Sequence, residues 1–149
     1  MTTAPAFVDE PHVLIDAPAD AVWRSLAAQF TSRPSAATGL FAHLVGTEPR
    51  RAFGRPPGLG ATAPGFEVTE AVEGKRLRLS GRHRFSRYRL TFTLTERDGG
   101  TDLAARTDAD FPGLRGLVYR TLVITSGAHK IVVARMLTSI RRRAEARRP

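Results

Sequence analysis

Three stretches of alternating apolar and polar residues decide the fold of this chain: KRLRLSG at residues 75–81, YRLTFTLTE at residues 88–96 and TDLAART at residues 101–107. A period of two is typical of strands that bury one face. Between the second and third stretch, Asp98 is followed by Gly99 and Gly100, which is a strong signal for a tight hairpin. The sequence therefore predicts a meander of neighbouring antiparallel strands.

The segments on either side of these stretches complete the predicted fold. The period of two extends back over residues 66–72, and a short apolar run at residues 12–16 is expected to form a strand at an edge of the sheet. Residues 19–30 predict a helix, and residues 126–148 predict a long C-terminal helix. We therefore expect an α+β fold, in which a curved antiparallel sheet wraps around the C-terminal helix. The residues expected on the buried stripe of that helix are His129, Val132, Val133, Met136 and Ile140.

The remaining segments give weaker signals. Residues 1–10 are expected to be a flexible arm, and residues 35–45 and 114–122 each suit a short helix. Residues 46–65 contain five glycines and four prolines, which predicts a loop that gates the mouth of a pocket. The whole chain, residues 1–149, is expected to be one domain, because this length suits one hydrophobic core.

Composition excludes several classes of site. The chain has no cysteine, so it has neither disulfides nor a thiolate metal site. Its four histidines lack the spacing of metal ligands, and the glycine-rich loop at residues 54–60 lacks the lysine of a phosphate-binding loop. We therefore expect no metal and no cofactor. No apolar run is long enough to cross a bilayer, and residues 1–9 do not resemble a signal peptide, so we expect a soluble cytoplasmic protein.

Four polar residues share the faces that the alternation assigns to the interior. Glu70 has the parity of Val68 and Val72, His83 and Tyr88 have the parity of the apolar residues of their strands, and His129 lies on the stripe of the C-terminal helix. Polar groups in a dry pocket can orient a ligand or transfer protons, so these four are the candidate catalytic residues. Each also has a purely structural interpretation, as a packed or rim residue bonded to a neighbour or to water.

A stripe of arginines gives a competing signal, together with a net charge of +9. Arg76, Arg78, Arg82 and Arg84 share the face opposite the apolar residues of their strand, and Arg87 and Arg89 continue it on the next strand. An anionic polymer or a membrane would be attracted to such a face. The stripe lacks the exposed aromatic residues of single-strand binders, which argues against nucleic acid. Glu67 and Asp102 are expected to neutralise part of it.

Two stretches carry a resemblance to a known family: HVLIDAPADAVW at residues 12–23 and GFEVTEAVEGKRLRL at residues 65–79. With the order of elements, they resemble the START-like/polyketide-cyclase superfamily, also called SRPBCC or helix-grip proteins. The resemblance implies a hydrophobic cavity between the sheet and the C-terminal helix. It implies no catalytic motif that can be placed on residues of this chain.

We therefore expect the cavity to bind a small apolar or aromatic molecule. One alternative is a polyketide cyclase or dehydratase that uses histidine and tyrosine residues of the cavity. A second is binding of an anionic polymer or a membrane through the arginine face. The sequence leaves the oligomeric state open, a homodimer included. The residues expected to line the cavity are Phe66, Val68, Leu79, Tyr88, Leu90, Phe92, Val132, Val133 and Met136, with polar contacts from His83 and His129.

Overall fold

A computed structural model describes residues 7–31, 62–63, 66–83, 86–110 and 128–146 of the chain. This part of the chain contains seven strands and two helices, and five of the strands and both helices follow one another in the predicted order. The elements are β1 (Phe7–Asp9), β2 (His12–Ile15), α1 (Ala19–Thr31), β3 (Thr62–Ala63), β4 (Phe66–Val72), β5 (Arg76–His83), β6 (Ser86–Arg97), β7 (Gly100–Asp110) and α4 (Ala128–Ala146).

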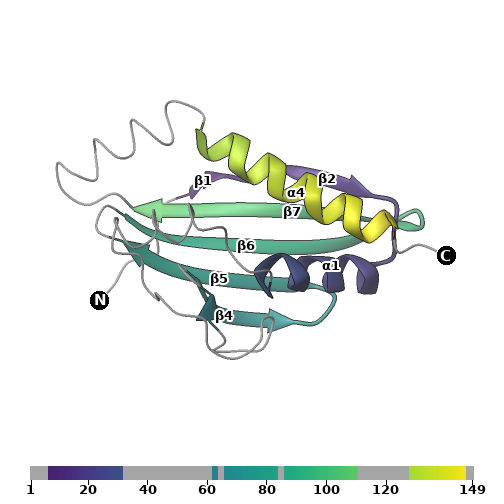
Figure 1. Cartoon of the computed structure of the whole chain (residues 1–149), viewed down its shortest axis with the longest axis horizontal. Helices are drawn as coiled ribbons and strands as arrows, with labels where there is room; N and C mark the ends of the chain where they lie inside the picture. The colour runs from purple at the N-terminus through teal and green to yellow at the C-terminus, as the bar shows by residue number, and fades with distance from the viewer. Residues whose placement is uncertain (1–6, 32–61, 64–65, 84–85, 111–127, 147–149) are drawn as a thin grey trace.

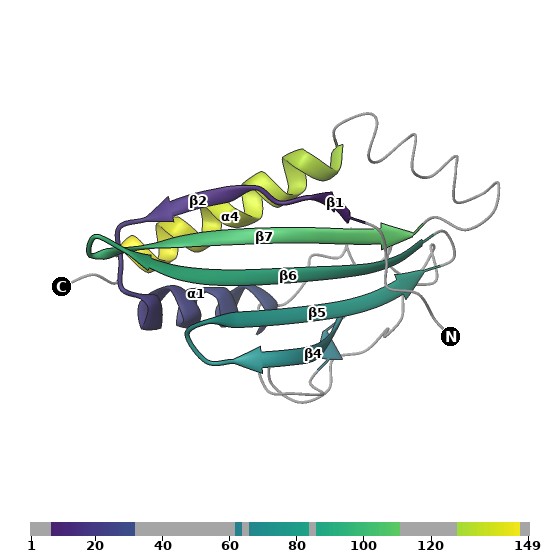
Figure 2. The same cartoon turned by 180° about the vertical axis from the view of Figure 1, so that it is seen from behind.

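The described strands form one antiparallel sheet, in the order β1-β7-β6-β5-β4-β3, and β2 also pairs with β7. Both helices lie on one face of the sheet. Figure 1 shows α1 and α4 in front of the curved strands, and Figure 2 shows the same strands with the helices behind them. The α+β helix-grip fold is therefore confirmed. The face that carries the helices is called the inner face below, and the opposite face is called the outer face.

The β6–β7 hairpin turns at the predicted position. Arg97 pairs with Gly100, and the two residues between them, Asp98 and Gly99, have φ angles of 44° and 85°. Two consecutive positive φ angles are what a type I′ turn requires, and glycine adopts them without strain. Gly100 is needed for another reason: a Cβ atom there would lie 2.7 Å from the carbonyl oxygen of Ile15. The turn and the close approach of β2 therefore explain both glycines.

The hydrophobic core lies between the inner face and the two helices. Leu77 pairs with Phe92 and Phe92 with Ala105, so one row of side chains crosses β5, β6 and β7. Two buried hydroxyl groups tie the helices to one another and to the sheet: Ser25 Oγ donates to the carbonyl oxygen of Ile140 at 2.7 Å, and Thr101 Oγ1 donates to that of Ala17 at 2.8 Å. Other core residues are Ile15, Val22, Leu26, Leu94, Leu103, Leu137 and Ala144.

Most of the predicted elements are confirmed, and two segments predicted to be irregular each contain a short strand. The strand at residues 12–16, the helix at residues 19–30 and the long C-terminal helix are all present. Residues 7–9 of the predicted flexible arm form β1 instead, which pairs with β7. The predicted loop at residues 46–65 includes β3, whose two residues pair with β4. The predicted helices at residues 35–45 and 114–122 lie outside the described residues, as does the rest of the loop.

A β-bulge in β4 corrects the predicted direction of Glu70. Val68 pairs with Leu79 and Glu70 pairs with Arg78, so the register shifts between the two pairs. The extra residue reverses the alternation, since a bulge sets two residues opposite one. Val68 is therefore buried, whereas Glu70 lies on the outer face beside Arg78, and Val72 is 44% exposed. The prediction that Glu70 points inward is wrong for this reason.

The buried stripe of α4 also differs from the prediction. Val133 is buried, but Val132 is 59% exposed, so its predicted inward position is wrong. The helix is rotated about its own axis relative to the predicted orientation, because Leu137, Ile140 and Ala144 are the residues that pack into the core. Met136 is partly buried against the same core. Neither helix in the described part of the chain is long and apolar enough to cross a membrane.

Candidate ligand-binding site

The inner face of the sheet changes character along its strands. Near the β6–β7 turn, Leu94 and Leu103 pair and are both buried under the helices. Towards the other end, Tyr88 pairs with Gly81 on one side and with Ala109 on the other. Small side chains therefore flank Tyr88, whereas mainly large side chains fill the core nearer the β6–β7 turn. This region, formed by Gly81, Tyr88, Leu90, Ala105, Thr107 and Ala109, is called the Tyr88 end of the inner face.

The Tyr88 end contains a buried hydroxyl group that is not hydrogen-bonded. Thr107 pairs with Leu90, so its side chain is on the inner face, and it is 6% exposed. Its Oγ1 atom has no hydrogen-bond partner among the described residues. An unsatisfied buried polar group costs about 1–3 kcal/mol, and most buried hydroxyl groups in proteins are paired. Thr107 is therefore a group that a bound molecule could satisfy.

The predicted cavity residues are distributed between the core and the surface. Val68, Leu79, Leu90, Phe92 and Val133 are buried and Tyr88 is partly buried. These residues lie on or against the inner face, as expected, and their contact with a ligand stays a prediction. The side chains of Phe66, His83 and His129 lie outside the described part of the structure. The described residues therefore do not test whether the two histidine side chains lie close to each other. The outward residues are Glu70 and Val132, as described above.

Thr107 is not among the site residues predicted from the sequence, although the pattern of β7 contains a signal for it. On β7, residues 103, 105, 107 and 109 alternate inward as leucine, alanine, threonine and alanine. The volume of these side chains falls sharply after Leu103, while their partners on β6 stay large. A threonine in such a run is easily taken for an ordinary strand residue, because threonine has a high β propensity. Only the burial of its oxygen without a partner distinguishes it.

Five arginines among the described residues of the outer face pair with carboxylates, but with acids other than those expected. Glu70 accepts from Arg76 and pairs with Arg78, each at 3.2 Å. The carboxylate of Asp108 is 1% exposed and lies 3.1 Å from Arg106 Nε. Glu67 and Asp102 were expected in this role, yet Asp102 bonds His12 at 2.9 Å instead. The remaining pairs are Arg87 with Asp110 at 3.4 Å and Arg89 with Asp108 at 3.6 Å.

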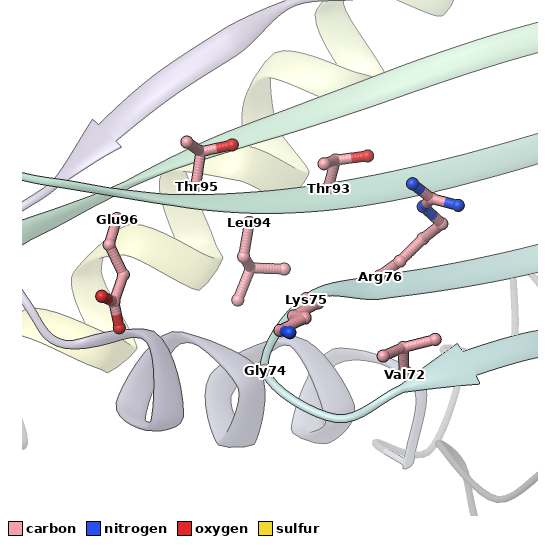
Figure 3. Close-up of a pocket in the computed structure, with 8 residues that line it drawn as sticks. All are labelled: Val72, Gly74, Lys75, Arg76, Thr93, Leu94, Thr95 and Glu96. Atoms are coloured by element: carbon pink, nitrogen blue, oxygen red, sulfur yellow. The ribbon is translucent and has the colours of Figure 1, made fainter.

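A shallow hollow lies beside the turn between β4 and β5, away from the Tyr88 end. Figure 3 shows Val72 on β4, Arg76 on β5 and Thr93 and Thr95 on β6 around it. These side chains belong to the outer face, and both cationic and acidic groups line the hollow. Its residues are therefore not those of the predicted cavity. Among the described residues, no three histidine, aspartate or glutamate side chains come together to hold a metal ion.

Comparison with known proteins agrees with the fold described above. The model of a family described as polyketide cyclase / dehydrase and lipid transport matches residues 10–145. No functionally curated protein matches the chain. Among solved structures, a protein from Nitrosospira multiformis is similar at a TM-score of 0.61 and 15% identity, covering 94% of this chain and 99% of its own. A protein from Thermus thermophilus is similar at a TM-score of 0.58 and 20% identity, covering 92% and 96%.

A third similar structure is DynU16, a protein of the dynemicin biosynthetic locus. Its TM-score is 0.55 at 18% identity, and the match covers 94% of this chain but only 48% of DynU16. Identities this low show a shared fold and do not carry function across. The family match is stronger, because it spans nearly the whole chain, from before β2 to the end of α4. The chain therefore belongs to the START-like polyketide cyclase / dehydrase and lipid transport family.

Proposed function

We propose that the Tyr88 end of the inner face binds a small, largely apolar or aromatic molecule that carries one hydrogen-bonding oxygen. The observation that carries this proposal is the buried hydroxyl group of Thr107, which has no partner among the described residues and lies among small side chains. Gly81, Ala105 and Ala109 take little volume on either side of Tyr88 and Thr107. Ligand sites are typically apolar concavities with a few polar groups that fix orientation, which is the composition found here.

The family supports the same proposal, since its description includes polyketide cyclases and lipid transport. Lipids are mostly hydrocarbon, and polyketide chains combine a carbon skeleton with carbonyl oxygens, so both classes offer apolar surface together with a hydrogen-bonding oxygen. Thr107 would donate a hydrogen bond to a carbonyl or hydroxyl oxygen of the ligand, and the ring of Tyr88 would pack against its apolar part.

Catalysis by a cyclase or dehydratase is the alternative. It would require a proton-transferring group beside the bound oxygen, and Glu70, one of the four predicted candidates, is on the outer face. Tyr88 is on the inner face, one strand from Thr107, and could orient a carbonyl. Replacing His83 and His129 by alanine would separate the two functions. An enzyme would lose turnover, whereas a binding protein would keep most of its affinity.

The test of binding uses displacement of Nile red, an uncharged apolar dye, by two ligands of nearly equal shape: 2-acetylnaphthalene, which has a carbonyl group, and 2-isopropenylnaphthalene, in which a CH2 group replaces the carbonyl oxygen. We expect the ketone to bind more tightly. Thr107→Val keeps the shape of the side chain and removes its hydroxyl, so it should weaken binding of the ketone by about 5–10-fold, the effect of one hydrogen bond. Binding of the hydrocarbon should not weaken.

Thr93→Val is the matched control, because it makes the same chemical change on the outer face of the neighbouring strand. It should leave both affinities unchanged. The proposal is wrong if Nile red does not bind, or if Thr107→Val weakens both ligands equally. It is also wrong if the control variant has the same effect as Thr107→Val.

A further inference from the structure

The first turns of α4 expose two large aliphatic side chains side by side. Ile131 is 56% exposed and Val132 is 59% exposed, whereas the next residue, Val133, is buried. Exposure of adjacent apolar side chains to water is unfavourable and often marks a surface that another molecule or a membrane covers. The buried stripe of the helix lies on the opposite side, so a partner could cover Ile131 and Val132 without disturbing the core.

The same side of α4 is strongly cationic. Arg135 and Arg142 follow Ile131 at intervals of four and eleven residues, which are helical repeats, so the three lie along one line of the helix surface. Arg135 and Arg142 are exposed and form no ion pair with a described residue. The helix contains one acid, Glu145, which pairs with Arg141 at 3.2 Å. A set of four residues, Ile131, Val132, Arg135 and Arg142, is called the α4 surface below.

The α4 surface differs from the arginine stripe of the outer face. On the sheet, Arg76, Arg78 and Arg106 each have a carboxylate within 3.2 Å. On α4, the cations surround a shallow hollow whose wall includes Arg135, Thr138 and Arg142 and, among the described residues, no acidic one. Unlike these sheet arginines, Arg135 and Arg142 combine unpaired positive charge with two exposed aliphatic side chains on the same side of one helix. An anionic partner would gain most by contact there.

We propose that the α4 surface docks on an anionic lipid bilayer. Ile131 and Val132 would enter the boundary between headgroups and acyl chains, and Arg135 and Arg142 would contact lipid phosphates, as at other amphipathic helices on membrane surfaces. The neighbouring aliphatic residues favour a membrane over nucleic acid, because single-stranded nucleic acid stacks on aromatic residues. A second copy of the chain is disfavoured, since a symmetric contact would bring the same cations together.

The experiment is sedimentation of the full chain with vesicles of phosphatidylcholine, with and without phosphatidylglycerol. We expect binding only to the anionic vesicles, weakening as salt is raised. Arg135→Gln with Arg142→Gln should weaken binding about 30-fold, since each cation near an anionic surface contributes about fivefold. Ile131→Ser with Val132→Ser should weaken it about tenfold or more, including at high salt, where charge is screened.

Lys75→Gln with Arg97→Gln is the matched control, because it removes two exposed cations that likewise form no ion pair with a described residue but lie in the turn between β4 and β5 and at the end of β6 rather than on α4. It should change binding by less than about threefold, the remaining effect of net charge. The proposal is overturned if anionic vesicles do not bind, or if the control variant loses as much affinity as the α4 variant. It is also overturned if the serine variant binds the vesicles normally, because the surface would then recognise negative charge alone. Binding to heparin, an anionic polymer without acyl chains, would show the same. None of these outcomes depends on ligand binding at the Tyr88 end.

Discussion

The two ends of the inner face are built from the same strands and differ in what fills them. At the turn end, Leu77, Phe92 and Leu103 are fully buried beneath α1 and α4. At the other end, Tyr88 has glycine and alanine as its cross-strand neighbours, and the hydroxyl of Thr107 is buried without a partner among the described residues. The difference shows that one continuous sheet carries large side chains at one end and small ones at the other, and the end with small side chains is the one proposed to bind a ligand.

The largest expected effect is on the free energy of unfolding and concerns the end of the inner face near the β6–β7 turn. Phe92→Ala removes a fully buried ring from the middle of the core and should lower the free energy of unfolding by about 3–5 kcal/mol. Chemical denaturation followed by circular dichroism measures this change. Thr107→Val in the same assay should change stability by less than about 0.5 kcal/mol, or raise it, because the lost hydroxyl was unsatisfied. Equal losses at both positions would show that the two ends do not differ in this way.

A smaller effect on stability is expected from the hydrogen bond that joins α1 and α4 near the β6–β7 turn. Ser25→Ala removes the 2.7 Å hydrogen bond from α1 to the carbonyl oxygen of Ile140 and should cost about 1 kcal/mol. Thermal unfolding detects such a loss. Binding of 2-acetylnaphthalene to the folded variant should be unchanged, because Ser25 is not part of the Tyr88 end. A variant that lost affinity but kept its stability would contradict the separation of the two ends.

The smallest effect concerns the outer face. Glu70→Gln removes one carboxylate that pairs with Arg76 and Arg78, all three of which are at least 30% exposed. Exposed ion pairs contribute little, so we expect a loss of about 0.5 kcal/mol and no change in ligand affinity. Denaturation and Nile red displacement on the same sample measure both quantities. A marked loss of affinity would indicate that Glu70 takes part in the site after all.

Sequence periodicity located the elements well and placed some single residues wrongly, for local reasons. The meander, the edge strand and both described helices follow from alternation, helical spacing and the Asp98–Gly99 turn. Glu70 and Val72 were wrong because one bulge residue reverses every later side chain of a strand. Val132 was wrong because the packing of α4 against α1 sets the rotation of the helix, and several adjacent apolar residues allow more than one stripe.

By itself, the sequence determined the fold class, the direction of the inner face on β5, β6 and β7, and the absence of disulfides. The first two follow from interactions between near neighbours along the chain, which a periodic pattern records directly, and the third follows from the absence of cysteine. Only the tertiary structure decided which acids neutralise the arginines, which hydroxyl groups find partners, and which side of α4 faces solvent. Such features depend on residues far apart in sequence, such as Ser25 and Ile140 or His12 and Asp102, and their distances are set by packing alone.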